Sequence, residues 1–181
     1  MASFGDPGAR LCVVGLAPGA SGANRTGRPF TGDHAGRLLY AMLDRHGFSE
    51  GTFDARPDDG LRLVDAMITN AVRCVPPQNK PTGAEINACR PFLAARLAAL
   101  PRLRAVLALG KIAHDSAVRA LGGRLAEAPF GHGARHELGG VALFGSYHCS
   151  RYNTNTGRLT EAMFDAVFAD IRGFLDGAGK A

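Results

Sequence analysis

The feature that most constrains the fold is the alternation of apolar runs with amphipathic segments along the chain. Four short runs of aliphatic residues are typical of buried strands. They occupy residues 10–16, 66–72, 103–109 and 141–147. Each run precedes a segment whose apolar residues have helical spacing, and these segments occupy residues 33–46, 82–100, 111–121 and 160–175. Strands that alternate with helices in this way predict an α/β fold, a three-layer α/β/α domain with a central, mainly parallel four-stranded sheet.

The bulk properties predict one soluble domain over residues 1–181. Hydrophobic residues make up 46% of the chain and charged residues 20%, and no linker divides it. No apolar run approaches the roughly 20 residues of a membrane helix, and we expect no secretory leader. We therefore expect a monomeric, cytoplasmic bacterial protein that does not bind membranes. Its four cysteines are then free thiols or metal ligands rather than disulfides.

Residues 15–33, between the first predicted strand and helix, form a loop rich in functional groups. The loop contains five glycines, two arginines, one phenylalanine and one aspartate. Glycine lets a backbone approach a ligand closely, arginine suits phosphate and an aromatic ring suits a flat ring. In parallel α/β sheets the ligand lies outside the carboxyl ends of the strands. We therefore expect the loops after the first, second and fourth strands to meet at one site.

Three segments carry a resemblance to a known family: Gly15–Asp33, Thr69–Thr82 and Ser146–Arg158. Together they resemble the uracil-DNA glycosylase superfamily, specifically its family 5 (type b), and the likeness extends from Phe4 onward. The resemblance implies a monofunctional DNA glycosylase for base excision repair. Such an enzyme flips uracil and other deaminated bases out of double- or single-stranded DNA and hydrolyses the N-glycosidic bond. It would be nucleoid-associated when bound to DNA. The alternative is a catalytically weak or inactive module that binds uracil or damaged DNA.

The resemblance implies a base-binding pocket formed by three parts of the chain. Phe30 would stack on the flipped base, and backbone from Ala17 to Gly19 would form the floor. Asn70 would read the base, because a primary amide accepts from uracil N3–H and donates to O4. The alternatives are a core position for Phe30 and a turn-capping role for Asn70.

Two residues are candidates for the chemistry. Asp33 would stabilise the positive charge on the sugar and orient the attacking water, although an aspartate here also suits a helix N-terminus. His148 would donate a hydrogen bond to O2 of the leaving uracil, although a structural histidine is the alternative. The superfamily usually has a proline after this histidine, whereas this chain has Cys149.

The net charge of +5 is compatible with a polyanionic partner, but an arginine-rich composition alone would give the same charge. In the superfamily, the loop after the histidine enters the minor groove, which makes Ser150, Arg151 and Tyr152 candidates for DNA contacts. The candidates for phosphate contacts are Arg25, Arg28, Lys80 and Arg158. For each of these, a solvated basic surface is the alternative.

Members of this family usually carry a [4Fe–4S] cluster on four cysteines. Cys74 and Cys89 match the second pair of ligands, and the N-terminal pair is absent from this sequence. A cubane cluster takes four cysteine ligands, so we predict that this chain has no intact cluster and no other cofactor. A shortened sequence and a lineage without a cluster both remain open as explanations.

Overall fold

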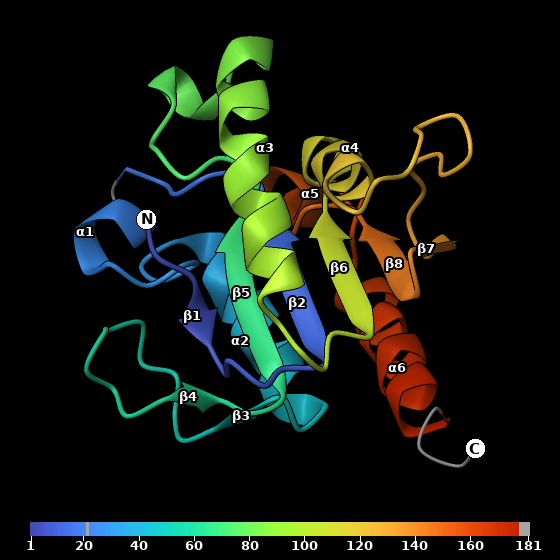
Figure 1. Ribbon diagram of the computed structural model, residues 1–181. Coiled ribbons are helices and arrows are strands. Elements are labelled where there is room, and N and C mark those ends of the chain that lie inside the picture. The colour runs from blue at the N-terminus through green and yellow to red at the C-terminus, as the bar shows by residue number, and fades with distance from the viewer. Residues whose placement is uncertain (21, 178–181) are drawn as a thin grey trace.

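The structure, a computed structural model, describes residues 1–20 and 22–177. Its centre is a six-stranded sheet in the order β1-β5-β2-β6-β8-β7, with helices on both faces (Figure 1). The strands of this sheet are β1 (Phe4–Gly5), β2 (Leu11–Gly15), β5 (Ala66–Asn70), β6 (Ala105–Leu109), β7 (Arg135–Leu138) and β8 (Val141–Ser146). The α-helices are α1 (Ala23–Thr26), α2 (His34–Arg45), α3 (Gly83–Ala98), α4 (Lys111–Ala120), α5 (Arg151–Asn155) and α6 (Glu161–Gly177).

The four inner strands are parallel and coincide with the four predicted apolar runs. Val13 of β2 lies opposite Ile68 of β5 on one side and Leu107 of β6 on the other. The prediction of four strands is wrong in number, because antiparallel β1 and β7 add an edge strand at each end. Strand β1 has two residues, and β7 alternates exposed and partly buried residues. Neither therefore forms an apolar run in the sequence.

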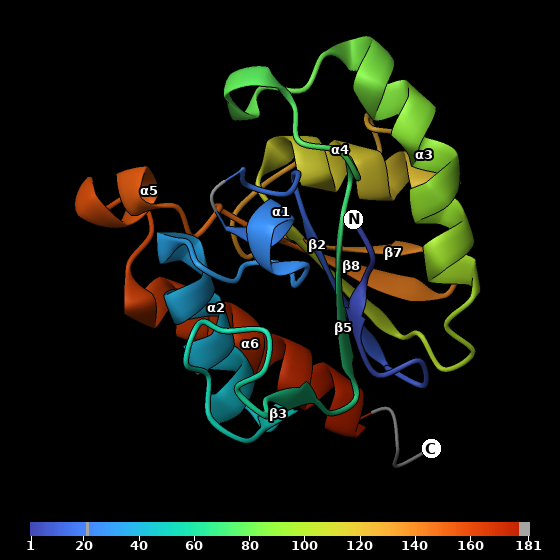
Figure 2. The ribbon, with the colours of Figure 1, turned by 90° about the vertical axis from the view of Figure 1, so that its left-hand side faces the viewer.

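Two apolar layers cover the two faces of the sheet, and successive residues of each inner strand alternate between them. Leu11 and Val13 face the layer that contains α2 and α6. Cys12 and Val14 face the layer with residues of α3 and α4. Side chains of a strand point alternately to opposite faces, so a strand covered on both sides is apolar at every position. Figure 2 shows the sheet between these two helix pairs.

Five further short elements lie outside the main prediction. Helices α1 and α5 occupy segments predicted as loops, and β3 (Ser49–Glu50) pairs with β4 (Arg62–Leu63) in a separate two-stranded sheet. A 3-10 turn, Pro77–Asn79, precedes α3. Among the described residues, no helix is long and apolar enough to cross a membrane.

Candidate active site

A cavity of about 350 Å³ opens at the carboxyl ends of the inner strands. It lies where the loops after β2, β5 and β8 meet, as the alternation of strands and helices predicts. Residues from all three loops line the cavity: Leu16, Ala17, Gly19, Ala23, Phe30, Asp33, Asn70, His148 and Ser150. The structure therefore brings together the predicted base-binding residues, both predicted catalytic residues and Ser150.

Phe30 and Asn70 lie side by side above the last residue of β2. A Cβ atom added to Gly15 would lie 2.5 Å from Asn70 Oδ1 and 2.7 Å from Phe30 Cζ. Glycine at this position therefore leaves the space that both side chains occupy. Phe30 adopts a φ of 55°, which side chains rarely adopt, and only 7% of it is exposed. Its ring also faces the His148 ring, with 6.0 Å between the ring centroids.

Asn70 presents an unused acceptor at the cavity. It is the last residue of β5 and is 6% exposed, and its Oδ1 atom has no hydrogen-bond partner among the described residues. Buried polar atoms are usually paired. Seven buried side-chain polar atoms of the described residues lack a partner, and Asn70 Oδ1 is the one that belongs to a residue lining this cavity. A ligand N–H group that enters the cavity would supply the missing partner.

The position of Asp33 is compatible with both roles that the sequence left as alternatives, the helix cap and the catalytic carboxylate. It is the N-cap of α2, and its Oδ1 atom accepts a hydrogen bond of 2.9 Å from the Gly36 N–H group. The residue is nonetheless exposed and lines the cavity. The cap fixes the position of the carboxylate through one oxygen, while the second oxygen is not needed for the cap.

His148 lines the same cavity and follows the end of β8 by two residues. Removal of the ring from water lowers its pKa below the ordinary value, and the Asp33 charge opposes this effect only in part. The imidazole is therefore neutral at pH 7. A neutral imidazole has one N–H group, which can donate a hydrogen bond to a ligand.

The backbone that carries His148 is held by its neighbours. Asn153 Nδ2 donates a hydrogen bond of 2.8 Å to the His148 carbonyl oxygen, and Ser150 caps α5. Cys149 is fully buried, and its thiol contacts the Ala35 carbonyl oxygen at 3.5 Å. Burial raises the pKa of this thiol to about 12, so it stays protonated and packs as a small apolar side chain. Contact with α2 thus holds this loop at the position where the superfamily usually has a proline.

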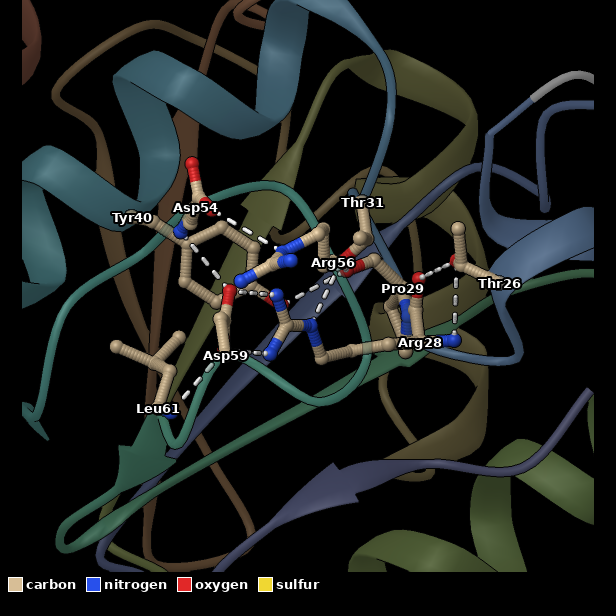
Figure 3. Close-up of polar contacts among 9 residues, drawn as sticks. All are labelled: Thr26, Arg28, Pro29, Thr31, Tyr40, Asp54, Arg56, Asp59 and Leu61. Carbon is tan, nitrogen blue, oxygen red and sulfur yellow. Dashed lines mark hydrogen bonds and ion pairs between the residues drawn. The ribbon is translucent and has the colours of Figure 1, made fainter.

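The candidates for DNA contacts differ in their exposure. Five of them have exposed side chains: Arg25, Lys80, Arg151, Tyr152 and Arg158. Tyr152 is 72% exposed on α5, beside the cavity residue Ser150. The prediction of a phosphate contact for Arg28 is wrong, because this side chain is 4% exposed and forms a buried ion pair with Asp59 (Figure 3).

The cysteines in the described residues do not form a metal site by themselves. Cys74 is exposed, Cys89 is partly buried, and Cys12 and Cys149 are buried in the protein. Residues 1–20 and 22–177 contain no group of three or more His, Cys, Asp or Glu side chains that could hold a metal ion. These residues do not fit a four-cysteine cluster, and no step proposed below uses one.

Sequence reasoning missed three residues that shape the cavity. Leu16 and Ala23 line it, and Ala23 belongs to the unpredicted helix α1. Gly36 does not line it but donates to Asp33, and a Cβ atom there would overlap the Phe30 carbonyl oxygen. Glycine has a low helix propensity, so a glycine in the first turn of a predicted helix indicates a close contact there. This was the signal in the sequence that could have identified Gly36.

Comparisons with known proteins identify the family to which the chain is similar. The family model described as "Uracil DNA glycosylase superfamily" matches residues 2–172. The type-5 uracil-DNA glycosylase of Thermus thermophilus is 49% identical over 170 residues, which are 93% of this chain and 77% of the relative. The type-5 enzyme of Mycobacterium tuberculosis is 46% identical over 93% of this chain, but the chain spans only 64% of that relative. The type-5 enzyme of Pyrobaculum aerophilum is 45% identical over 87% of this chain and 68% of the relative.

Proposed function

This chain belongs to the uracil-DNA glycosylase superfamily and, within it, to the type-5 enzymes, and we propose that it removes uracil from DNA. The reaction is hydrolysis of the bond between uracil N1 and sugar C1′, which leaves an abasic site for base excision repair. The observation that carries this proposal is the Asn70 amide oxygen, which has no hydrogen-bond partner in the described part of the chain. It lies beside the Phe30 ring in a cavity that Asp33 and His148 also line.

The cavity supports recognition of a base that has left the duplex. Extrusion of a base costs a few kcal/mol, which stacking and hydrogen bonds inside the enzyme offset. Phe30 provides the stacking surface, and Asn70 Oδ1 accepts the N3–H group of uracil. Cytosine has no N–H group at N3, so it would leave the buried Asn70 oxygen unpaired. This difference favours uracil over cytosine.

The two catalytic candidates act on opposite charges. As the bond breaks, positive charge develops on the sugar and negative charge on the leaving uracil. The Asp33 carboxylate stabilises the sugar and orients a water molecule, whose oxygen bonds to C1′. The electron pair of the broken bond goes to uracil N1 and is delocalised onto O2, to which the neutral His148 ring donates its N–H. The water loses one proton to the Asp33 carboxylate as its oxygen becomes the C1′ hydroxyl, and uracil leaves as the N1 anion, which takes up a proton from solvent. Water is the nucleophile, which is why we propose a monofunctional enzyme.

The proposed partner is DNA that contains uracil, in double or single strands. The exposed cations Arg25, Lys80, Arg151 and Arg158 are candidates for phosphate contacts. Tyr152, exposed on α5 beside the cavity, is the candidate that fills the space left by the flipped base. Contacts to phosphate would make binding weaken steeply as salt rises.

The direct test is excision from a duplex with one uracil, followed by alkaline cleavage of the abasic site. We expect the wild type to release uracil and Asp33→Asn to be slower in single turnover by about 10²-fold or more. Asparagine can still accept the hydrogen bond from Gly36 N–H, so the midpoint of thermal unfolding should stay close to that of the wild type.

The control is Asp170→Asn, which removes an exposed carboxylate of α6 on another part of the surface. This variant is expected to match the wild type in rate. A wild type that excises no uracil from double or single strands would contradict the proposal. Tight binding of such DNA without turnover would instead indicate a binding module.

A further inference from the structure

Arg28 is a charged side chain buried next to the base-binding loop. Its Nη1 and Nη2 atoms donate to the two carboxylate oxygens of Asp59 at 2.8 Å and 2.7 Å. Its Nε atom donates to Thr31 Oγ1 at 2.7 Å, as Figure 3 shows. The side chains of the ion pair are 4% and 1% exposed. The guanidinium also lies 5.4–5.5 Å from the centroids of three rings, those of Phe4, Tyr40 and Phe53.

Stability alone does not explain this buried pair. Two charges lose their hydration on burial, and replacement by well-packed apolar residues is often neutral or stabilising. A fork of parallel hydrogen bonds does provide a fixed direction, which an apolar contact lacks. The pair therefore suits the task of orienting a segment of the chain.

The oriented segment is the one that carries Phe30. Arg28 binds Thr31 on the far side of Phe30, and the Tyr40 hydroxyl donates a hydrogen bond of 2.8 Å to the Pro29 carbonyl oxygen. The residues on both sides of Phe30 are thus tied to buried partners. Phe30 itself has a φ of 55°, a conformation that costs about 1–3 kcal/mol and persists only where its surroundings enforce it.

The Asp59 carboxylate is also fixed by hydrogen bonds from its own loop. It accepts hydrogen bonds from the backbone N–H groups of Asp54 at 2.9 Å and Leu61 at 3.0 Å. Phe53 of the same loop stacks on Tyr40, with 4.3 Å between ring centroids. Residues 53–61 therefore form a fixed support, although none of them lines the cavity around Phe30.

We propose that Arg28 and Asp59 are positioning residues that hold the Phe30 ring in its base-stacking conformation. This inference rests on the proposed function of the cavity, since it assumes that Phe30 stacks on a base. It assigns to Arg28 a structural support for base binding in place of a phosphate contact. Neither residue touches the substrate in this arrangement.

The test uses three variants of graded severity. Asp59→Asn removes one charge, Arg28→Lys keeps the charge but loses the fork, and Tyr40→Phe keeps the ring but loses the bond to Pro29. The control is Asp65→Asn, which breaks the ion pair of Arg10 and Asp65, at 2.6 Å on another part of the domain. Circular dichroism identifies the variants that fold.

Three measurements separate positioning of the base from general stability. These are the single-turnover rate on a uracil duplex, inhibition by free uracil, and affinity for a duplex with a tetrahydrofuran abasic analogue. The first two need the base stack, whereas the third does not. We expect the three variants to lose rate and uracil inhibition by roughly ten- to hundredfold, with Tyr40→Phe at the low end, and to keep abasic-duplex affinity within about twofold. Asp65→Asn is expected to leave all three unchanged.

A double-mutant cycle with Phe30→Leu gives the decisive result. If the pair acts through Phe30, Asp59→Asn or Tyr40→Phe has no further effect on the rate once the ring is gone. Additive effects, or folded variants with wild-type uracil inhibition, would overturn the inference. A wild type without excision activity would contradict the proposed function instead, and binding of free uracil would still test the positioning role.

Discussion

Asn70 Oδ1 is buried at the end of β5 without a hydrogen-bond partner in the described residues. An unsatisfied buried acceptor costs about 1–3 kcal/mol. A base with an N–H group at the matching position would remove this cost on binding. If Asn70 reads the base as proposed, its oxygen is unpaired in the free protein and paired in the complex. A turn cap would instead be paired in the free protein.

Asn70→Leu tests this distinction. We expect the free energy of unfolding to stay unchanged or to rise by up to about 1 kcal/mol, because an apolar group of similar size replaces an unpaired oxygen. The excision rate and the inhibition by free uracil should fall by about 10²-fold or more, since base recognition is lost. Urea denaturation and single-turnover assays measure the two effects. A clear loss of stability with full activity would instead indicate a structural cap.

Individual residues were predictable to different degrees. Phe30, Asp33, Asn70 and His148 follow strands or precede a helix, so the alternation of elements places them at one edge of the sheet. Arg28 lies in the same loop and has the same residue type as a phosphate ligand. Its burial depends on Asp59, 31 residues away in a loop without periodicity, and local sequence does not report such a partner.

Helix α2 joins the base pocket to the core through its first turn. Asp33 caps the helix, and Gly36 in that turn lies against the Phe30 carbonyl oxygen, where a Cβ atom would overlap. The start of α2 and Phe30 are therefore packed as one unit. A change that shifts either is expected to shift both.

Gly36→Ala should therefore lower both stability and activity. Overpacking against backbone costs about 1–3 kcal/mol, occasionally more, so we expect a loss of about 2 kcal/mol or above. The matched control is Gly173→Ala in α6, where a Cβ atom meets nothing within 4 Å. That change should raise stability by about 0.5–1 kcal/mol, because glycine is the less favourable residue within a helix. Thermal unfolding of both variants decides, and equal effects would contradict this packing.

Among the elements, the long ones with apolar residues were predicted from the sequence, and the short polar ones were not. The long helices and inner strands carry clear apolar periodicity and were predicted within a few residues. Helix α5 has five residues and none of them is buried, so no apolar stripe marks it. Ser150 at its N-cap was the only local signal, and a serine in a polar loop is compatible with many turns.

Acid should destabilise the whole molecule through three histidines, of which His114 is buried and His132 and His148 are partly buried. Removal from water lowers the pKa of His114, His132 and His148 below the ordinary value. The unfolded chain then binds more protons than the folded chain below about pH 6.5. Their contribution to stability is therefore complete above that pH and is lost as the pH falls through the lowered pKa values.

Urea denaturation at several pH values between about 5 and 8 measures this dependence. The free energy of unfolding should decrease toward acid, and His132→Asn should flatten the dependence. His132 Nδ1 accepts the Tyr147 N–H group at 3.2 Å, and an asparagine oxygen can accept it without titrating. Stability that stays level or rises toward acid would contradict this account.

For the molecule as a whole, the apolar pattern of the strands predicted the layers of the fold but not the order of the strands in the sheet. Apolar runs at every position predict a sheet covered on both faces, and this is confirmed by the two layers around β2. The order β5-β2-β6-β8 depends on how each helix crosses the sheet, and the runs themselves do not encode it. The edge strands were missed because one is very short and the other is polar.

These two edge strands have a consequence for how the protein behaves in a crowded solution. A bare sheet edge offers unpaired N–H and C=O groups to any passing chain, which is how aggregates grow strand by strand. Here one edge has only two residues, and the other carries Arg135 and Glu137 at exposed positions. Such edges are poor templates for another strand, so they disfavour edge-to-edge aggregation of folded chains.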